Sequence, residues 1–203
     1  MTRLILLSAL ILFSCGDNVK FEVPQPEGKG NEDAFPKKIR GMYRNLKDSS
    51  LLTITADQIT RMYNIRFVVH KSDLDSAIKV KGDTSFYDAV EKLTVTVKGD
   101  SAYGRINYID TLFYISSNNL LRVFKGYYYL NKMKSFNNWE VDLMQVKGKE
   151  LTILSDWNES DLINMRRITH TSDSTRTFKP TRGQLKKFIR EKSMKDGEIY
   201  KKI

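Results

Sequence analysis

The stretch from residue 105 to residue 155 limits the possible folds of this chain more than any other. It is a series of short apolar segments rich in β-branched and aromatic residues, separated by breaks of Ser, Asn, Lys and Gly. Along 139–143 apolar residues alternate with Glu and Asp, a period of two that is typical of a half-buried strand. The sequence therefore predicts consecutive antiparallel strands across this stretch.

A hairpin is indicated nearer the start of the body. Residues 51–55 form one apolar segment, and a long alternation runs from Ile59 to Val69. We predict two strands with a turn at 56–57. A helix starting at Thr55 is the alternative, because Thr55 and Gln58 have the spacing of a capping box, but the length of the alternation favours a strand.

Further elements are expected outside these strands. Short helices are predicted over 85–92 and about 181–194, from capping-box spacing and apolar residues at helical intervals. Thr181 is the expected N-cap of the second helix. Strands are predicted over 93–97 and, as the last strand, over 162–170.

Together these elements indicate a mainly β fold: an antiparallel up-and-down meander with one or two short helices, including a C-terminal one. Spacing long enough for βαβ units is not evident. Closing a meander on itself removes its exposed edges, so the sequence favours a barrel or a strongly curved half-barrel.

The segment Gly41-Met42-Tyr43 precedes the first strand of the body, and a helix is expected near the C-terminus. This pattern resembles the calycin superfamily, whose barrels often open with Gly-x-Trp and end with a helix packed outside. The resemblance implies that Arg166 or Arg167 covers the Tyr43 ring, as an arginine does in lipocalins. The whole chain is similar to the uncharacterised lipocalin-like lipoproteins common in Bacteroidota.

The N-terminus has a positively charged start and an apolar run from Leu4 to Phe13, which ends at Ser14-Cys15. The run is too short for a bilayer span of about 20 residues but suits a signal peptide. The residues around Cys15 resemble the lipobox of bacterial lipoproteins. That resemblance implies removal of residues 1–14 and acylation of Cys15, for example with palmitate. Gly16 then implies the outer membrane, with the periplasmic or surface side left open. A secretory leader with a chance cysteine is the alternative.

Residues 15–36 contain several Pro and Gly, mixed charges and few apolar positions, a composition typical of a flexible linker. We therefore expect three parts: a lipoprotein signal peptide over 1–14, the lipidated Cys15 with a flexible tether over 15–36, and a single β-barrel domain over 37–203.

The formal net charge of +10 is concentrated at the C-terminus, where nine Lys/Arg and three Asp/Glu lie between Lys179 and Ile203. A solvated helix face is the simplest interpretation. Contact with the anionic head groups of a membrane is the alternative. Nucleic acid is not an expected partner of an exported chain.

Side chains suited to metal binding or catalysis do not converge in the sequence. His70 and His170 are far apart and are expected near strand ends. Asp156-x-Asn158-x-Ser160 starts like a calcium loop but lacks the required Gly and Glu, so we interpret it as an Asx-rich turn. Asp73 and Asp75 are expected in a solvated loop. With Cys15 acylated and no nucleophile elbow or phosphate-binding loop, we predict neither a cofactor nor enzymatic activity.

The run Tyr127-Tyr128-Tyr129 places Tyr127 and Tyr129 on one face of a strand and Tyr128 on the other. Core filling is the expected role, and an aromatic wall that faces a ligand is the alternative.

Two functions from different classes remain. The first is a non-catalytic binding module that holds an apolar or amphipathic small molecule in the mouth or cavity of the barrel. The second is an accessory lipoprotein whose outer surface and basic C-terminal helix dock on a larger envelope assembly. The interior distinguishes them: an open apolar cavity favours the ligand, and an interior filled by the chain's own side chains favours docking.

Overall fold

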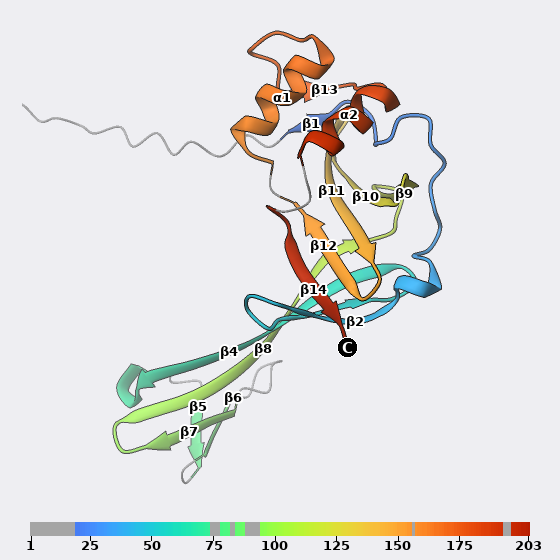
Figure 1. The fold of residues 1–203 in the computed structure, drawn as a ribbon. Coiled ribbons are helices and arrows are strands. Elements are labelled where there is room, and N and C mark those ends of the chain that lie inside the picture. The colour runs from blue at the N-terminus through green and yellow to red at the C-terminus, as the bar shows by residue number, and fades with distance from the viewer. Residues whose placement is uncertain (1–18, 74–77, 82–83, 88–93, 156, 193–195) are drawn as a thin grey trace, which may run out of the picture.

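The computed structural model describes residues 19–73, 78–81, 84–87, 94–155, 157–192 and 196–203. The described chain is mainly β, as predicted, with two α-helices (Figure 1). Its strands are β1 (Lys20–Phe21), β2 (Gly41–Asn45), β3 (Leu51–Ile54), β4 (Gln58–His70), β5 (Ile78–Lys81), β6 (Thr84–Tyr87), β7 (Thr94–Lys98), β8 (Ser101–Tyr114), β9 (Asn119–Phe124), β10 (Tyr127–Ser135), β11 (Asn138–Lys147), β12 (Glu150–Leu154), β13 (Thr177–Phe178) and β14 (Glu198–Lys202). The helices are α1 (Glu159–Thr169) and α2 (Arg182–Lys192), with 3₁₀ turns η1 (Lys37–Ile39) and η2 (Lys71–Asp73).

The described strands form one sheet in the order β13-β1-β11-β12-β14-β2-β3-β4-β8-β7-β6-β5, with β10 and then β9 paired to the other edge of β11. Every pairing is antiparallel except that of β1 with β13. The predicted meander is confirmed from β9 to β12, whereas β8 pairs with β4 and β7 and not with β9. The predicted hairpin is confirmed in β3 and β4. The strand predicted over 93–97 is confirmed in β7.

The sheet curves without closing into a barrel, since β13, β5 and β9 are each terminal strands in the order of the described strands. Its curvature is seen in one buried cluster that joins side chains of β2, β3 and β4 to side chains of β9, β10 and β12. Tyr43, Phe113 and Tyr200 are among the largest members of this cluster, and each is at most 2% exposed. The inside of the curve is therefore filled by the chain's own aromatic residues.

The outer face of β10 and β11 is covered by the two helices (Figure 1). Leu162 and Met165 of α1 and Phe188 of α2 are buried there against Tyr129 and Trp139. Alternation along β10 thus sends Tyr128 to the inner cluster and Tyr129 to the helix-facing cluster. Both faces of this part of the sheet are core.

The strand predicted over 162–170 is wrong, because α1 covers these residues up to Thr169. The Asn158 side chain accepts a hydrogen bond from the Asp161 N–H, and the Asp161 carboxylate accepts one from the Asn158 N–H. This capping box satisfies two of the first free N–H groups of the helix. Apolar residues three apart, at Leu162, Met165 and Ile168, supply the buried stripe.

The second predicted helix is confirmed, and the first is not. In α2 the Thr181 N–H and hydroxyl both donate to Gln184 Oε1 at 2.9 and 3.0 Å, and the Gln184 N–H donates back to Thr181 at 3.3 Å. By contrast, the start of the helix predicted over 85–92 lies in β6, which pairs with β5 and β7. The remainder of that prediction lies outside the described residues, as do the predicted signal peptide over 1–14 and Cys15.

Residues 19–36 are packed on the body and do not form the predicted free tether. Val19 and Phe21 are buried in the helix-facing cluster, and β1 pairs with β11 and β13. The Gln25 N–H donates to Asn131 Oδ1 at 2.5 Å. Arg122 donates from Nη1 to the carbonyl oxygens of Pro24 and Pro26. Side-chain partners far along the sequence therefore order a segment whose own composition is typical of a linker.

The longest strands, β4 and β8, leave the body together as an arm (Figure 1). They pair from Gln58 and Tyr114 to His70 and Ser101, with a bulge next to Ile59. Beyond Met62 they extend past the ends of the shorter strands β2 and β3. A two-stranded ribbon is at best marginally stable in water, and β5, β6 and β7 add three more strands along β8 at its far end.

Candidate functional site

The arm has two faces that the register of β4 and β8 defines. On the inner face, Tyr63 lies opposite Tyr108 and Ile65 opposite Ile106, and this face continues from Ile59 in the body. The Tyr63 and Tyr108 rings stack with centroids 6.3 Å apart. Ile65 and Tyr108 are about half exposed, at 49% and 50%.

The other face, here called the outward face, is a ladder of four cross-strand pairs. Its pairs are Met62 with Ile109, Asn64 with Asn107, Arg66 with Arg105, and Val68 with Tyr103. Val68, Tyr103 and Ile109 are between 46% and 63% exposed. The arm therefore presents apolar side chains to solvent on both of its faces, which a sheet in a folded core does not do.

Two arginines lie directly opposite each other in the middle of the outward face. Arg66 and Arg105 are both exposed, and neither forms an ion pair with a described carboxylate. Like charges at opposed strand positions destabilise a sheet, on the scale of about 0.2–1 kcal/mol per pair. Fold stability therefore gives no reason for this pair, and an anionic group placed between the two guanidinium groups removes the repulsion.

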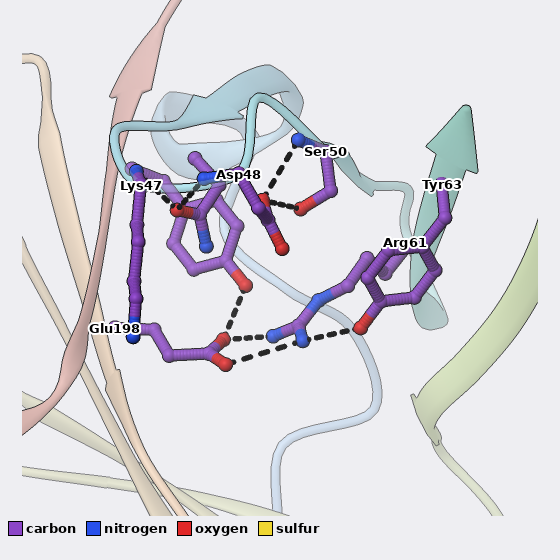
Figure 2. Close-up of polar contacts among 8 residues, drawn as sticks. Lys47, Asp48, Ser50, Arg61, Tyr63 and Glu198 are labelled. Carbon is purple, nitrogen blue, oxygen red and sulfur yellow. Dashed lines mark hydrogen bonds and ion pairs between the residues drawn. The ribbon is translucent and has the colours of Figure 1, made fainter. Parts of the chain in front are cut away.

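The arm is joined to the body by a polar cluster around the buried Arg61, here called the root (Figure 2). Arg61 donates from Nη1 to Tyr63 Oη at 2.7 Å and forms a bidentate ion pair with the Glu198 carboxylate of β14. Its guanidinium carbon lies 5.6 Å from the Tyr63 ring centroid and 5.5 Å from that of Tyr200. Because β2 and β3 separate β4 from β14 in the sheet, this contact holds only while the sheet is curved.

The electrostatics of the root favour the ion pair. Burial alone would lower the pKa of Arg61, but the Tyr63 hydroxyl, Tyr200 and Glu198 outweigh it and raise the pKa. Burial and the 2.5 Å hydrogen bond to Glu198 raise the pKa of Tyr200, so its hydroxyl stays protonated as a donor. The root is a fixed cation held by an anion and two aromatic rings, which is a structural joint and not a proton-transfer site.

The turn between β2 and β3 lies beside the root (Figure 2). Asp48 Oδ1 accepts hydrogen bonds from the Ser50 N–H at 2.9 Å and the Ser50 hydroxyl at 2.7 Å. Burial raises the pKa of Asp48, but these hydrogen bonds and the charge of Arg61 outweigh that effect and lower it. Asp48 therefore remains ionised and adds a second negative charge near Arg61.

The residues singled out from the sequence are dispersed. His70 ends β4 at the tip of the arm, and His170 is the left-handed C-cap of α1. His70 Nδ1 lies 2.7 Å from Ser72 Oγ in an exposed turn. In a catalytic triad the carboxylate orients the imidazole, whereas here the Asp73 carboxylate accepts a hydrogen bond from the Ser72 hydroxyl. Asp75 and Asp156 lie outside the described residues. Asn158 is the N-cap of α1 and Ser160 lies in its first turn.

The residue expected to cover Tyr43 is a different one. Arg166 donates to the Thr175 carbonyl at 2.8 Å and pairs with Glu159, while Arg167 pairs with Glu191 of α2. The prediction for both arginines is therefore wrong. Lys202 of β14 places its ammonium group 5.5 Å from the Tyr43 ring centroid, because β14, and not a strand at 162–170, pairs with β2.

No group of three or more His, Cys, Asp or Glu is placed to hold a metal ion in the described part of the chain. No described helix has the length and apolar character that a bilayer crossing requires.

Comparison with known proteins gives no relative. No family model matches the chain, and no curated protein or solved structure is significantly similar to it. The geometry of the arm and its root therefore carries the functional argument.

Proposed function

We propose that this protein is a non-catalytic accessory lipoprotein of the bacterial envelope, held at the outer membrane by acyl chains on Cys15, which docks on a larger assembly through its arm. The observation that carries this proposal is the outward face, where exposed Val68 and Tyr103 lie next to the Arg66–Arg105 pair and exposed Ile109 lies on the other side, beyond the asparagine pair. Tyr and Arg are enriched at the energetic centres of protein interfaces. The filled interior of the curved sheet supports docking over a ligand held inside it.

The positive charge of the outward face indicates what kind of partner it can bind. Two adjacent guanidinium groups without a described counter-ion fit a protein surface that presents carboxylates, with apolar residues on either side. The partner we propose is thus an acidic protein surface of the envelope assembly.

The size of the arm indicates how the partner binds. From Met62 to His70 the ribbon is roughly 26 Å long at about 3.3 Å per residue. With a width of about 10 Å, one face of the β4–β8 ribbon by itself offers on the order of 260 Å², below the ~800 Å² per partner of a stable interface; β7, β6 and β5 widen the sheet only at its far end. Exposed apolar residues on both faces therefore fit a cleft that receives the arm better than a flat surface does.

The finer description of the fold is part of the same proposal. We propose that the body is a calycin-like half-barrel, supported by the meander β9 to β12, by Gly41-Met42-Tyr43 at the start of β2, and by α2 packed outside the sheet. In this proposal the basic α2 faces the envelope assembly or the membrane.

A photo-reactive residue in place of Tyr103 tests the docking proposal in cells that produce the full chain. We expect one envelope protein to be cross-linked, and the yield to fall at least tenfold when Arg66→Glu and Arg105→Glu are added. The matched control places the photo-reactive residue at Phe136, an 89% exposed residue in the β10–β11 turn. Equal cross-linking from both positions, or no effect of the charge reversals, would contradict docking through the arm.

The anchor is tested separately by metabolic labelling with palmitate. We expect label in the wild-type chain and none in Cys15→Ala. An unlabelled wild-type chain would remove the lipoprotein part of the proposal and leave the docking part standing.

A further inference from the structure

A pocket of about 440 Å³ lies where α2 crosses the end of the β9–β10–β11 meander. This volume is within the usual range for small-molecule sites, which begins near 300 Å³. Tyr127 and Tyr129 of β10 line it together with Ile189 of α2. None of its lining residues belongs to the arm, and α2 lies on the body away from the arm (Figure 1), so the contacts proposed for the arm do not involve this pocket.

The local structure explains why aromatic residues form its wall. Tyr127 lies opposite Phe124 of β9 on one side and Gln145 of β11 on the other, so all three side chains share the face toward α2. Tyr129 follows on the same face and is 1% exposed. Burial raises the pKa of Tyr129, which keeps its hydroxyl neutral. The wall is thus apolar with neutral polar tips.

The rim of the pocket is cationic. Lys186 and Arg190 lie one helical turn apart on α2, with Ile189 between them on the side toward the pocket. Lys147 comes from the end of β11, two residues beyond Gln145. Lys125 comes from the β9–β10 turn, where both Lys125 and Gly126 have positive φ. None of the lining residues is a carboxylate.

Some basic residues of the body have their charge compensated within the fold. Lys132, Lys192 and Arg167, for example, each form an ion pair with a carboxylate. The four rim residues form none with any described carboxylate. Four like charges around one opening repel one another, and a bound anion replaces this repulsion with attraction. The rim is therefore prepared for a negative group, and the wall beneath it for an apolar one.

We propose that this pocket binds a small anionic amphiphile, with a phosphate or carboxylate head held by the rim and an apolar body against Tyr127, Phe124 and Ile189. Free inorganic phosphate leaves the aromatic wall unused, and a neutral apolar molecule leaves the four charges uncompensated. An amphiphile uses both halves, and it is the chemistry of lipids and lipid precursors.

Titration of the full chain with octyl phosphate tests the proposal, with the protein held in nanodiscs of neutral phosphatidylcholine and empty nanodiscs as the blank. Trp157 reports binding by fluorescence, because it packs on Phe188 with ring centroids 5.4 Å apart, next to Ile189. We expect saturable binding of octyl phosphate. Octanol and inorganic phosphate are each expected to bind at least tenfold more weakly.

Charge reversal locates the binding site. Lys186→Glu with Arg190→Glu is expected to weaken octyl phosphate binding at least tenfold, while Lys187→Glu, an exposed neighbour outside the pocket, changes it by less than twofold. All variants are exposed substitutions, and unchanged thermal unfolding checks their fold. The proposal is overturned by absence of saturable binding, by equal affinity for inorganic phosphate, or by an equal effect of Lys187→Glu.

A second arm of the experiment identifies the source of the head group. Nanodiscs that contain phosphatidylglycerol offer the same chemistry from a membrane. Competition with octyl phosphate supports the pocket as a membrane-lipid site, and lack of competition supports it as a site for a free amphiphile.

Discussion

The body and the arm share the strands β4 and β8, but apolar side chains that are buried in the body are partly exposed on the arm. Ile59 and Ile65 lie on the same face of β4; Ile59 is fully buried in the body, and Ile65 is 49% exposed on the arm. In the body, burial on both sides of β10 supplies stability. On the arm, exposed apolar side chains contribute little to folding and favour association. The comparison separates residues that fold the chain from residues available for a partner.

The largest difference in free energy of unfolding is expected between substitutions in an ion pair of the body and in the ion pair of the root. Lys192 and Asp161 lie 2.5 Å apart between α2 and α1, with side chains only 4% and 5% exposed. Lys192→Met leaves the Asp161 carboxylate buried without this partner, and removal of one member of a buried pair costs about 3–5 kcal/mol. We expect urea unfolding to show that loss.

The root supplies the control for this prediction. The Glu198 side chain is 49% exposed, so water compensates much of what Glu198→Gln removes, and we expect a loss of about 1 kcal/mol or less. Equal losses of stability for Lys192→Met and Glu198→Gln would mean that the difference in burial does not affect the contribution of the two ion pairs.

The pair Ile59 and Ile65 isolates burial within a single strand. Ile59→Ala opens a cavity in the filled interior and is expected to cost about 3 kcal/mol. Ile65→Ala removes a half-exposed side chain and is expected to cost less than about 1 kcal/mol. Chemical unfolding of both variants, at unchanged m-value, measures the difference. Similar losses would show that the arm is as tightly packed as the body.

The root is expected to control the arm more than the body. Arg61→Ala removes two ring contacts and leaves the Tyr63 hydroxyl and Glu198 without their partner, a loss of about 2 kcal/mol. Limited proteolysis should then cut within 62–70 faster than in the wild type. Arg61→Lys keeps the charge but not the bidentate geometry and should be intermediate.

Arg66→Ala is the matched control on the outward face. It should change stability by less than about 0.5 kcal/mol, with unchanged proteolysis, because Arg66 has no described partner in the fold. Faster cleavage in Arg66→Ala than in Arg61→Ala would contradict the root as the joint of the arm.

Local patterns in the sequence predict much of the sheet. Period-two alternation and turn residues identify the β3–β4 hairpin and the β9–β12 meander, because both signals act between neighbours in the chain. The sequence predicts a strand in place of α1 because Leu162, Ile163 and Ile168 are also compatible with a strand. Its cap uses Asp161 where a capping box more often has Glu or Gln. Packing against the sheet then favours the helix.

The sites depend on contacts that no local pattern contains. Arg61 and Glu198 are 137 residues apart, and their meeting requires β14 to pair between β12 and β2. The pocket likewise needs α2 to cross the end of β11. One feature of the arm is visible in the sequence, namely apolar residues on both faces of the segments that form β4 and β8. These strands have 13 and 14 residues, so the four-residue β3 can pair with only part of β4.

The smallest expected effect is the pH response of the Asp48 turn, which lies on the body side of the root. The pKa of Asp48 is lowered from its ordinary value of 3.8. A carboxyl group with a lowered pKa in the folded state contributes stability above the unfolded value, and that contribution is lost as the pH falls through the folded value. The advantage of the wild type over Asp48→Asn should therefore be present at pH 5 and shrink below about pH 4.

Ser50→Ala sharpens this last test, because it removes the 2.7 Å hydroxyl hydrogen bond and keeps the carboxylate. Titration of the Asp48 carboxyl group by NMR should then show a pKa closer to its ordinary value, with a weaker loss of stability in acid. Arg61→Ala should move the same pKa upward, since the Arg61 charge is one of the causes that lower it. An Asp48 pKa that ignores Arg61 would mean that the turn and the arm are not electrostatically coupled, and the root would then be confined to Arg61, Glu198 and the two tyrosine rings.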